Sequence, residues 1–326
     1  MAIPAHMVSV SGGKDSTATY LLALERRERT GREFHAVFAD TGHEHQWTLD
    51  FVNEIASKTG GPEVQVVRAD FTHYLARKRK TIATKWREEG VPEEKVLRAL
   101  ELCVPTGIPF LDLCIGNGRF PSAKGRFCTG GLKIWPIQDL AYSPRWERGE
   151  TIISWQGLRA EESPARRDLP RFARLESVEN YTAYMDRPIR QGPAIRYLPI
   201  LKWELQDVWK MHYKHGIEPN PLYHRGANRV GCFPCIYGRK GELRMWAERF
   251  PEHVDRVREW ERIVRDASKR GDPTFFPHLN NPKMTGIDNI VVWSKTARGG
   301  KFKALLPIDD IRVEMGMSCG EWGVCE

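Results

Sequence analysis

Residues 11–16, with the sequence Ser-Gly-Gly-Lys-Asp-Ser, have the types and the spacing that phosphate binding requires. They lie between a short apolar run and a helical pattern. Glycines let backbone N–H groups approach a phosphate closely, and the start of a helix adds unpaired N–H donors. Lys14 and the hydroxyl groups of Ser11 and Ser16 supply further donors. We therefore predict a phosphate loop of a type other than Walker A, since the spacing differs. The alternative is an ordinary strand–turn–helix with a capping residue.

The cysteines form the second group of residues suited to chemistry. There are seven, an odd number that argues against a disulfide framework. Cys232 and Cys235 form a Cys-x-x-Cys turn that can present two thiolates to one metal centre, and the distant Cys128 can supply a third. On spacing alone, Cys128 could instead be a buried apolar residue, with the turn binding zinc or doing thiol redox chemistry. Cys103 and Cys114 flank an apolar stretch, and we expect them to be structural.

Alternating strand and helix patterns position these residues. Strand-like runs cover residues 6–10, 35–39, 64–67 and 151–155, and helical patterns cover 17–29 and 47–58. The alternation predicts βαβ units, and hence an α/β fold with a doubly wound, mostly parallel sheet and helices on both faces. Ligands of such sheets bind at the carboxyl ends of the strands.

The remaining patterns are mainly helical. The pattern over residues 72–102 predicts helix with many basic residues. These basic residues could form a solvated helix face or a positive rim over an anionic substrate. Residues 240–270 predict an amphipathic helix broken near Pro251, and residues 289–293 predict a strand. We expect a nucleotide-binding domain over 1–230 and a smaller, mainly helical region over 231–326.

Composition and charge narrow the class of protein. The 326 residues are 41% hydrophobic and 28% charged, which suits a globular chain that buries a core without disulfides. The net charge of +8 favours a polyanionic partner such as a nucleotide or a nucleic acid. No apolar run approaches the roughly 18 residues of a membrane span. The amino terminus does not resemble a signal peptide, so we expect a reducing cytoplasm.

Residues 11–16 resemble the PP-loop of the ATP pyrophosphatase superfamily, whose members cleave ATP between the α and β phosphates. Further segments, in order, resemble the phosphoadenosine phosphosulfate (PAPS) reductase family. These segments are residues 38–44, 155–166, 198–200 and 220–223. The resemblance covers most of residues 6–240 and implies a fold of the adenine nucleotide alpha-hydrolase type.

The resemblance also implies a set of site residues. The implied nucleotide-binding residues are Ser11, Gly12, Gly13, Lys14, Asp15, Ser16, Asp40, Gly157, Arg159 and Arg166. Asp40, at a strand end, could hold Mg²⁺ or a ribose hydroxyl, or could instead cap a helix. We expect Glu161 and Glu162 to form ion pairs with the nearby arginines. Lys14, Asp15, Asp40 and Cys319 are the expected catalytic residues.

In relatives that carry a 4Fe–4S cluster, ligands come from a cysteine before Leu-Lys-x-x-Pro and from a later Cys-x-x-Cys. Cys128, Cys232 and Cys235 match this pattern. Assimilatory reductases have adjacent cysteines at the first position, whereas Phe127 stands beside Cys128 here. The fourth ligand could be Cys319 or Cys325, or the fourth iron could be open to sulfur.

An intact loop favours ATP cleavage, because dedicated reductases of the family generally carry an altered loop. An intact loop with a cluster resembles the iron–sulfur enzyme of DNA phosphorothioation and also nucleobase thiolation enzymes. The resemblance thus implies adenylation of a DNA or RNA oxygen, with release of AMP and pyrophosphate and transfer of sulfur. Sulfur would come from the cluster or Cys319, with a cysteine desulfurase as donor. Basic residues at 77–87, with Arg166, Arg167, Arg171 and Arg174, could track the acceptor backbone.

Two alternatives stay open. The first is a PAPS or adenylyl-sulfate reductase that forms sulfite with Cys319 as nucleophile and a thioredoxin-like reductant. Residues 318–321, Ser-Cys-Gly-Glu, match the Glu-Cys-Gly-x-His segment of those enzymes only in part. The second is a nucleic-acid-binding partner without catalysis. A homodimer is a further candidate assembly.

Overall fold

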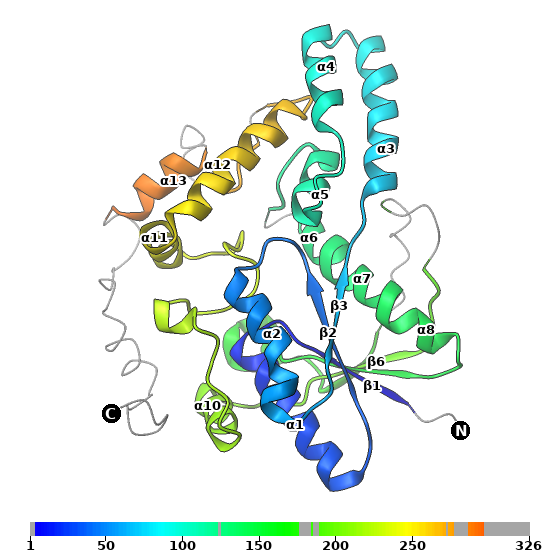
Figure 1. Cartoon of the computed structure of the whole chain (residues 1–326), viewed down its shortest axis with the longest axis vertical. Helices are drawn as coiled ribbons and strands as arrows, with labels where there is room; N and C mark the ends of the chain where they lie inside the picture. Colours follow the sequence, from blue (N-terminus) through cyan, green and yellow to red (C-terminus); the bar gives the residue numbers. More distant parts are fainter. Residues whose placement is uncertain are drawn as a thin grey trace.

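The structure is a computed structural model that describes residues 4–122, 125–175, 184, 189–271, 273–276 and 286–296. Its centre is a six-stranded sheet in the order β3-β2-β1-β4-β6-β5 (Figure 1). The strands are β1 (Ala5–Ser9), β2 (His35–Asp40), β3 (Val64–Arg68), β4 (Ile152–Trp155), β5 (Phe172–Arg174) and β6 (Ala194–Tyr197). All neighbours pair in parallel except β5 with β6. The predicted α/β class is confirmed.

The strand order reverses at β1, which has β2 on one side and β4 on the other. A reversal of this kind opens a crevice at the carboxyl ends of the strands, where α/β sheets bind ligands. Residues 11–16 follow β1 directly and lie at this crevice.

Helices cover both faces of the sheet (Figure 1). On one face lie α1 (Lys14–Thr30), α2 (Gln46–Thr59) and α10 (Leu205–Lys214), which share a core with β1 and β2. On the other face lies a helical stretch over residues 127–146. It consists of α6 (Phe127–Thr129), η2 (Gly130–Ile134), α7 (Trp135–Ile137), η3 (Gln138–Tyr142) and α8 (Ser143–Trp146). Tyr142 and Trp146 pack there against Met7 and Val37.

A third core lies beside the sheet and joins helices from two parts of the chain. The earlier helices are α3 (Thr72–Thr81), η1 (Ile82–Trp86), α4 (Glu93–Leu102) and α5 (Pro109–Asn117). The later helices are α11 (Lys240–Arg249), α12 (Pro251–Asp266) and α13 (Ile287–Ser294). Cys103 and Cys114 are fully buried in this core, as expected of structural cysteines. The helix break at Pro251 is confirmed, whereas the domain boundary near residue 230 stays a prediction.

The predicted strand at residues 289–293 is wrong, because these residues belong to helix α13. A short apolar run does not distinguish a strand from a buried helix. Ile287, Ile290 and Ser294 are buried at helical spacing, while Val292 is 64% exposed. Packing against α11 and α12 therefore selects the helix.

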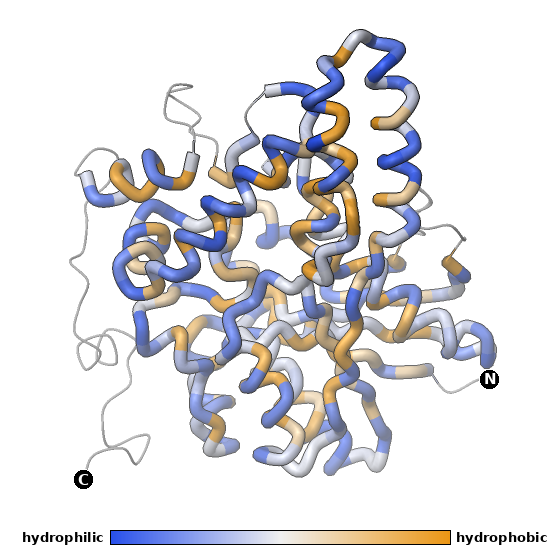
Figure 2. The backbone as a smooth tube through the Cα atoms, turned by 45° about the horizontal axis from the view of Figure 1, so that its top comes forward, coloured by the Kyte–Doolittle hydropathy of each residue, from blue (hydrophilic) through white to orange (hydrophobic). Residues whose placement is uncertain are grey.

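Helices α3 and α4 form a hairpin that projects from the body of the molecule (Figure 1). Its α3 arm is largely hydrophilic, whereas the hydrophobic residues gather along the contacts between the packed elements (Figure 2). Within the described part of the chain, no helix combines the length and the apolar character needed to cross a membrane.

Candidate functional site

The loop of residues 11–16 closes around the first turn of α1. The Ser16 hydroxyl accepts a hydrogen bond from the Ser11 backbone N–H at 3.0 Å and donates to the Gly13 carbonyl at 2.9 Å. Gly12 has a φ of +71°, and a Cβ atom there would lie 2.7 Å from the Thr48 side chain of α2. Glycine is therefore required at this turn, which leads from β1 into the start of α1.

Side chains from residues 212–223, about 200 residues further along the chain, form hydrogen bonds with the backbone of this loop. The Tyr223 hydroxyl accepts from the Lys14 backbone N–H at 2.9 Å, and Nε2 of His212 lies 2.9 Å from the Lys14 carbonyl oxygen. Asn220 donates from its amide to the Gly12 carbonyl at 3.3 Å. All three side chains are buried. Sequence analysis included Asn220 and Tyr223 in a motif without a role and missed His212, which carries no local signal.

Replacing Tyr223 with phenylalanine should weaken ATP binding and lower the free energy of unfolding by about 1–3 kcal/mol, because a buried N–H loses its acceptor. Thermal unfolding and ATP titration measure the two effects. Tyr20→Phe is the matched control, since it removes a 2.8 Å hydrogen bond to the Pro62 carbonyl at a point remote from the loop. It should lower stability and leave ATP affinity unchanged. Equal ATP affinity in both variants would contradict the assigned role of Tyr223.

Asp15 connects the loop to the segment after β4. Its carboxylate lies 2.9 Å from the Lys14 ammonium and 2.5 Å from Nε of Arg159. Burial alone would lower the pKa of Arg159, but attraction to Asp15 and Glu161 raises it, so the guanidinium stays charged. The expected ion pairs are confirmed, because Glu161 pairs with Arg159 and Glu162 pairs with Arg166.

Gly157 is placed at the loop through its backbone. A Cβ atom on it would lie 2.7 Å from the Asp15 carbonyl oxygen and 2.9 Å from the Thr19 hydroxyl. The segment after β4 therefore packs directly on the first turn of α1, which only a residue without a side chain permits.

A Gly157→Ala variant should move the first turn of α1 and weaken ATP binding, with a loss of about 1–3 kcal/mol in unfolding free energy from overpacking. Calorimetric titration with ATP and thermal unfolding measure these changes. Gly241→Ala provides the control, because a Cβ atom at this glycine would meet open space. If both variants bound ATP like the unaltered chain, the close approach at Gly157 would have no bearing on the site.

Asp40 ends β2 at the same edge of the sheet. Its carboxylate accepts from the Gly42 N–H at 2.7 Å and lies 3.5 Å from Nε of Arg68. The alternative role of Asp40 as a helix cap is wrong for α2, whose N-cap is His45. Asp40 is thus fixed at the carboxyl end of the strand beside β1, where it can face a ligand of the loop.

The three predicted cluster cysteines gather near Lys133. Cys232 and Cys235 line a cavity of about 170 Å³ together with Lys133. Cys128, in α6, interacts electrostatically with both thiols. Burial raises the pKa of Cys232 to about 12 against the attraction of Lys133, and attraction to Cys232 and Glu44 raises the pKa of Lys133. The Lys133 ammonium group favours the deprotonated form of the nearby sulfur. In the sequence, Lys133 is the lysine of the Leu-Lys-x-x-Pro pattern, to which no role was assigned.

The turn after β2 joins the cysteine cavity to the nucleotide edge. The Phe233 N–H donates to the His43 carbonyl at 2.7 Å, and Glu44 pairs with Cys232 as a β-bridge. The buried Glu44 carboxylate accepts from the Thr41 N–H at 3.0 Å and lies 3.7 Å from the Cys232 sulfur. Residues 40–44 therefore run from the carboxyl end of β2, the strand beside β1, to the Cys-x-x-Cys turn.

Among the described residues, no three His, Cys, Asp or Glu side chains are grouped closely enough to hold a single metal ion. A 4Fe–4S cluster binds its thiolates through separate irons, so its ligands surround a volume and do not converge on one point. Two thiols that line a cavity with a lysine, and a third thiol close enough to interact with both, suit that arrangement. The assignment of Cys128, Cys232 and Cys235 stays a prediction, and Cys319 and Cys325 lie outside the described residues.

Comparisons with known proteins bear on the family. The model described as "Phosphoadenosine phosphosulfate reductase domain" matches residues 5–237. An uncharacterized 37.8 kDa protein of Escherichia phage 186 is 42% identical over 345 aligned residues, which cover 98% of this chain and 96% of that protein. An uncharacterized protein of Methanocaldococcus jannaschii is 27% identical over 75% of this chain and 44% of its own length.

Named enzymes match over shorter stretches. The adenosine 5'-phosphosulfate reductase of Geobacillus thermodenitrificans is 32% identical over 85 residues, or 26% of this chain and 30% of that enzyme. The crystal structure of PAPS reductase from Candida auris in a phosphate complex aligns with 72% of this chain and 83% of its own, at 17% identity and a TM-score of 0.39. The domain match over residues 5–237, well over half of the chain, shows that the protein belongs to the phosphoadenosine phosphosulfate reductase family.

Proposed function

We propose that the protein is an ATP-dependent sulfurtransferase that releases AMP and pyrophosphate and carries a 4Fe–4S cluster. The observation that supports it most is the turn at residues 40–44, which leads from the end of β2, the strand beside the one that precedes the phosphate loop, to Cys232 of the thiol-lined cavity. A site that activates an acceptor with ATP and then delivers sulfur needs these two parts side by side.

In the first step, an acceptor oxygen attacks the α-phosphorus of ATP, and the bond to the pyrophosphate breaks. The loop amides, the Ser11 hydroxyl group and Lys14 hold the departing pyrophosphate, while the Ser16 hydroxyl group, which donates to Gly13, fixes the shape of the loop. Mg²⁺ held by Asp40 would neutralise phosphate charge. Arg159 keeps Asp15 oriented at the loop through its 2.5 Å ion pair.

In the second step, sulfur forms a bond to the activated atom of the acceptor, and the bond from that atom to the adenylated oxygen breaks to release AMP. Cys128, Cys232 and Cys235 would hold the cluster, which supplies an iron able to bind sulfur. Lys133 offsets the negative charge of the thiolates in a partly buried place. The turn at Glu44 keeps Cys232 at the nucleotide edge.

The acceptor and the partners belong to the same proposal. A nucleic acid suits the net charge of +8, and a cysteine desulfurase would supply sulfur. The chemistry requires a reducing compartment such as the cytoplasm, and assembly as a homodimer is compatible with it.

The experiment incubates protein prepared without oxygen with ATP and Mg²⁺, with and without sulfide and single-stranded nucleic acid. AMP and pyrophosphate in equal amounts, formed faster when the strand is present, are the expected products. Release of ADP and phosphate, or ATP that stays intact under every condition, would refute the proposal.

A PAPS or adenylyl-sulfate reductase is the second candidate, because named adenosine 5'-phosphosulfate reductases match parts of the chain. In that reaction Cys319 would attack sulfur, and a thioredoxin-like reductant would release sulfite. Sulfite formed from adenylyl sulfate by the unaltered chain and not by a Cys319→Ser variant would establish this function. Equal sulfite production by both would exclude Cys319 as the nucleophile.

A further inference from the structure

A second cavity, distinct from the thiol-lined one, lies at the carboxyl end of β3. Its volume is about 400 Å³, and its walls include Arg68, Asp70, His73, Trp135, Asp139 and Tyr184. We propose that this cavity binds a nucleobase of a single-stranded acceptor and so anchors the strand beside the reacting position. The inference deepens the proposed function, on which it rests for the acceptor being a nucleic acid.

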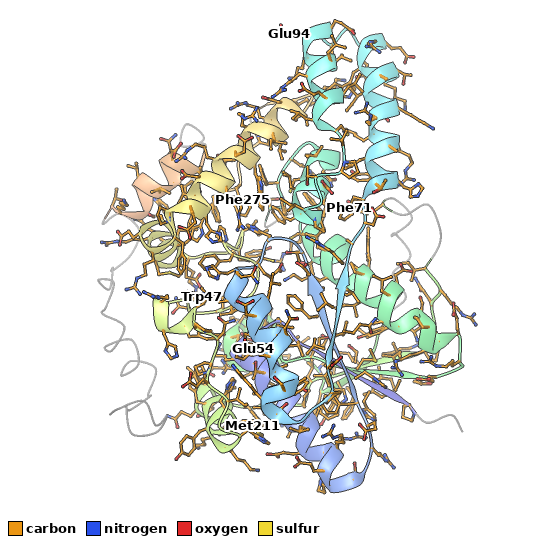
Figure 3. The ribbon with its side chains drawn as sticks, in the orientation of Figure 1. Trp47, Glu54, Phe71, Glu94, Met211 and Phe275 are labelled. Atoms are coloured by element: carbon orange, nitrogen blue, oxygen red, sulfur yellow. The ribbon has the colours of Figure 1, made fainter. Side chains whose placement is uncertain are left out.

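Aromatic rings form one wall of the cavity. The Tyr184 ring lies 4.5 Å from that of Trp135 and 6.1 Å from that of Phe71, measured between centroids. Phe71 stands where α3 leaves the end of β3 (Figure 3). Phe71 and Trp135 are buried and support the Tyr184 ring, which is partly exposed and can present a face to a base. Proteins that bind single strands stack unpaired bases on aromatic side chains, with little dependence on sequence.

Polar groups surround the aromatic wall with both kinds of hydrogen-bonding partner. Asp139 is a buried carboxylate in the wall, and Asp70 lies at the start of α3. Carboxylates accept from the exocyclic amino groups of bases, while the Arg68 guanidinium donates to ring nitrogens and carbonyl oxygens. An apolar wall with paired donors and acceptors suits a heteroaromatic base better than a phosphate or a lipid chain.

The cavity is set apart from the thiols by one helical stretch. Gly131, Trp135 and Asp139 recur every four residues along it and line the base cavity. Lys133 lines the thiol cavity instead. Arg68 lies 3.5 Å from Asp40, which connects the base cavity with the nucleotide edge. A base held here would therefore leave the neighbouring nucleotide of the strand facing the site.

A positive track leads away from the cavity. Arg77 and Lys80 are exposed cations three residues apart on one face of α3, and the exposed His73 of the cavity wall lies one turn before Arg77. This face runs along the projecting hairpin (Figure 1), whose α3 arm is largely hydrophilic (Figure 2). Cationic side chains spaced along a groove or a helix hold a nucleic acid backbone without reading its sequence.

This cavity and the phosphate loop at residues 11–16 lie at different places along the edge of the sheet. The loop follows β1, and β3 lies beyond β2 in the sheet order, about 10 Å from β1 at ordinary strand spacing. The adenine of ATP is the competing occupant, and the experiment below distinguishes it.

The experiment measures binding of fluorescent 12-nucleotide strands to the full chain. The probes are oligodeoxycytidylate, oligothymidylate, oligocytidylate and a strand of the same length without bases. Tyr184→Ala should weaken binding of the strands with bases by about tenfold or more and leave the baseless strand and ATP unaffected. Tyr213→Ala, a change at a 58% exposed tyrosine on α10, is the matched control. A preference between cytidylate and deoxycytidylate would identify the acceptor as RNA or DNA.

A second variant, Arg77→Ala with Lys80→Ala, changes exposed residues only. It should weaken all strands alike and make the binding less dependent on salt. Equal affinity of Tyr184→Ala and the unaltered chain for every strand would overturn the proposal, as would weaker binding of ATP by Tyr184→Ala. Strand binding that depends on Tyr184 in a protein that leaves ATP intact would support the cavity while refuting the proposed function.

Discussion

Replacing Lys14 with methionine should reduce ATP cleavage by about 100-fold or more, the usual effect of removing one preorganised donor from a developing charge. The Lys14 ammonium group is 2.9 Å from Asp15, and the side chain is only 10% exposed. Methionine keeps the length and packing of the stem, so the loop should retain its fold. The loss should appear in the rate of AMP release at saturating ATP.

Lys210→Met is the control for this substitution. The Lys210 side chain is 74% exposed on α10 and pairs with Asp207 of the same helix, so the variant should cleave ATP at the full rate. A Lys14→Met protein that released AMP as fast as the control would exclude a role of this ammonium group in stabilising pyrophosphate.

Replacing Cys232 with serine should remove most of the iron and acid-labile sulfide from protein prepared without oxygen. A thiolate binds iron far better than a hydroxyl group, and Cys232 lines the cavity beside Lys133. Cys128→Ser and Cys235→Ser should behave alike. Metal analysis and the visible absorption spectrum of each variant measure the loss.

Cys103→Ser is the matched control for the cysteine variants. Cys103 is fully buried among helices, and its thiol lies 3.7 Å from the Leu75 carbonyl oxygen, which a serine hydroxyl group can also reach. This variant should keep its iron. Zinc without iron in the unaltered chain, or full iron content in Cys232→Ser, would contradict the cluster assignment.

The local parts of the fold follow from the sequence. The strands before residues 11–16 and before Asp40 were predictable because apolar runs bounded by polar residues mark buried strands. The parallel arrangement followed from the alternating helices. The strand predicted at residues 289–293 was wrong because a run of four apolar residues suits either a strand or a helix, and contacts with α11 and α12 decide between them.

The residues of the site likewise divide into those that the local sequence indicates and those that only the folded chain brings together. Ser16 and Gly12 act within their own turn, so the sequence indicates them directly. His212 and Lys133 act on partners about 200 and 100 residues away, Lys14 and Cys232, and nothing near them in the chain indicates that contact. Glu44 reaches Cys232 only because the turn after β2 pairs with the Cys-x-x-Cys segment. Long-range contacts of this kind depend on the assembled fold.

The most direct test of the central claim offers ATP and PAPS together to protein prepared without oxygen, with single-stranded nucleic acid as acceptor, a thiol reductant and Mg²⁺. The products are then identified by ³¹P NMR and sulfite analysis. We predict that ATP is converted to AMP and pyrophosphate, in a reaction that the Lys14→Met variant loses, while PAPS persists. Sulfite formed from PAPS with ATP untouched would contradict the account and identify the protein as a reductase.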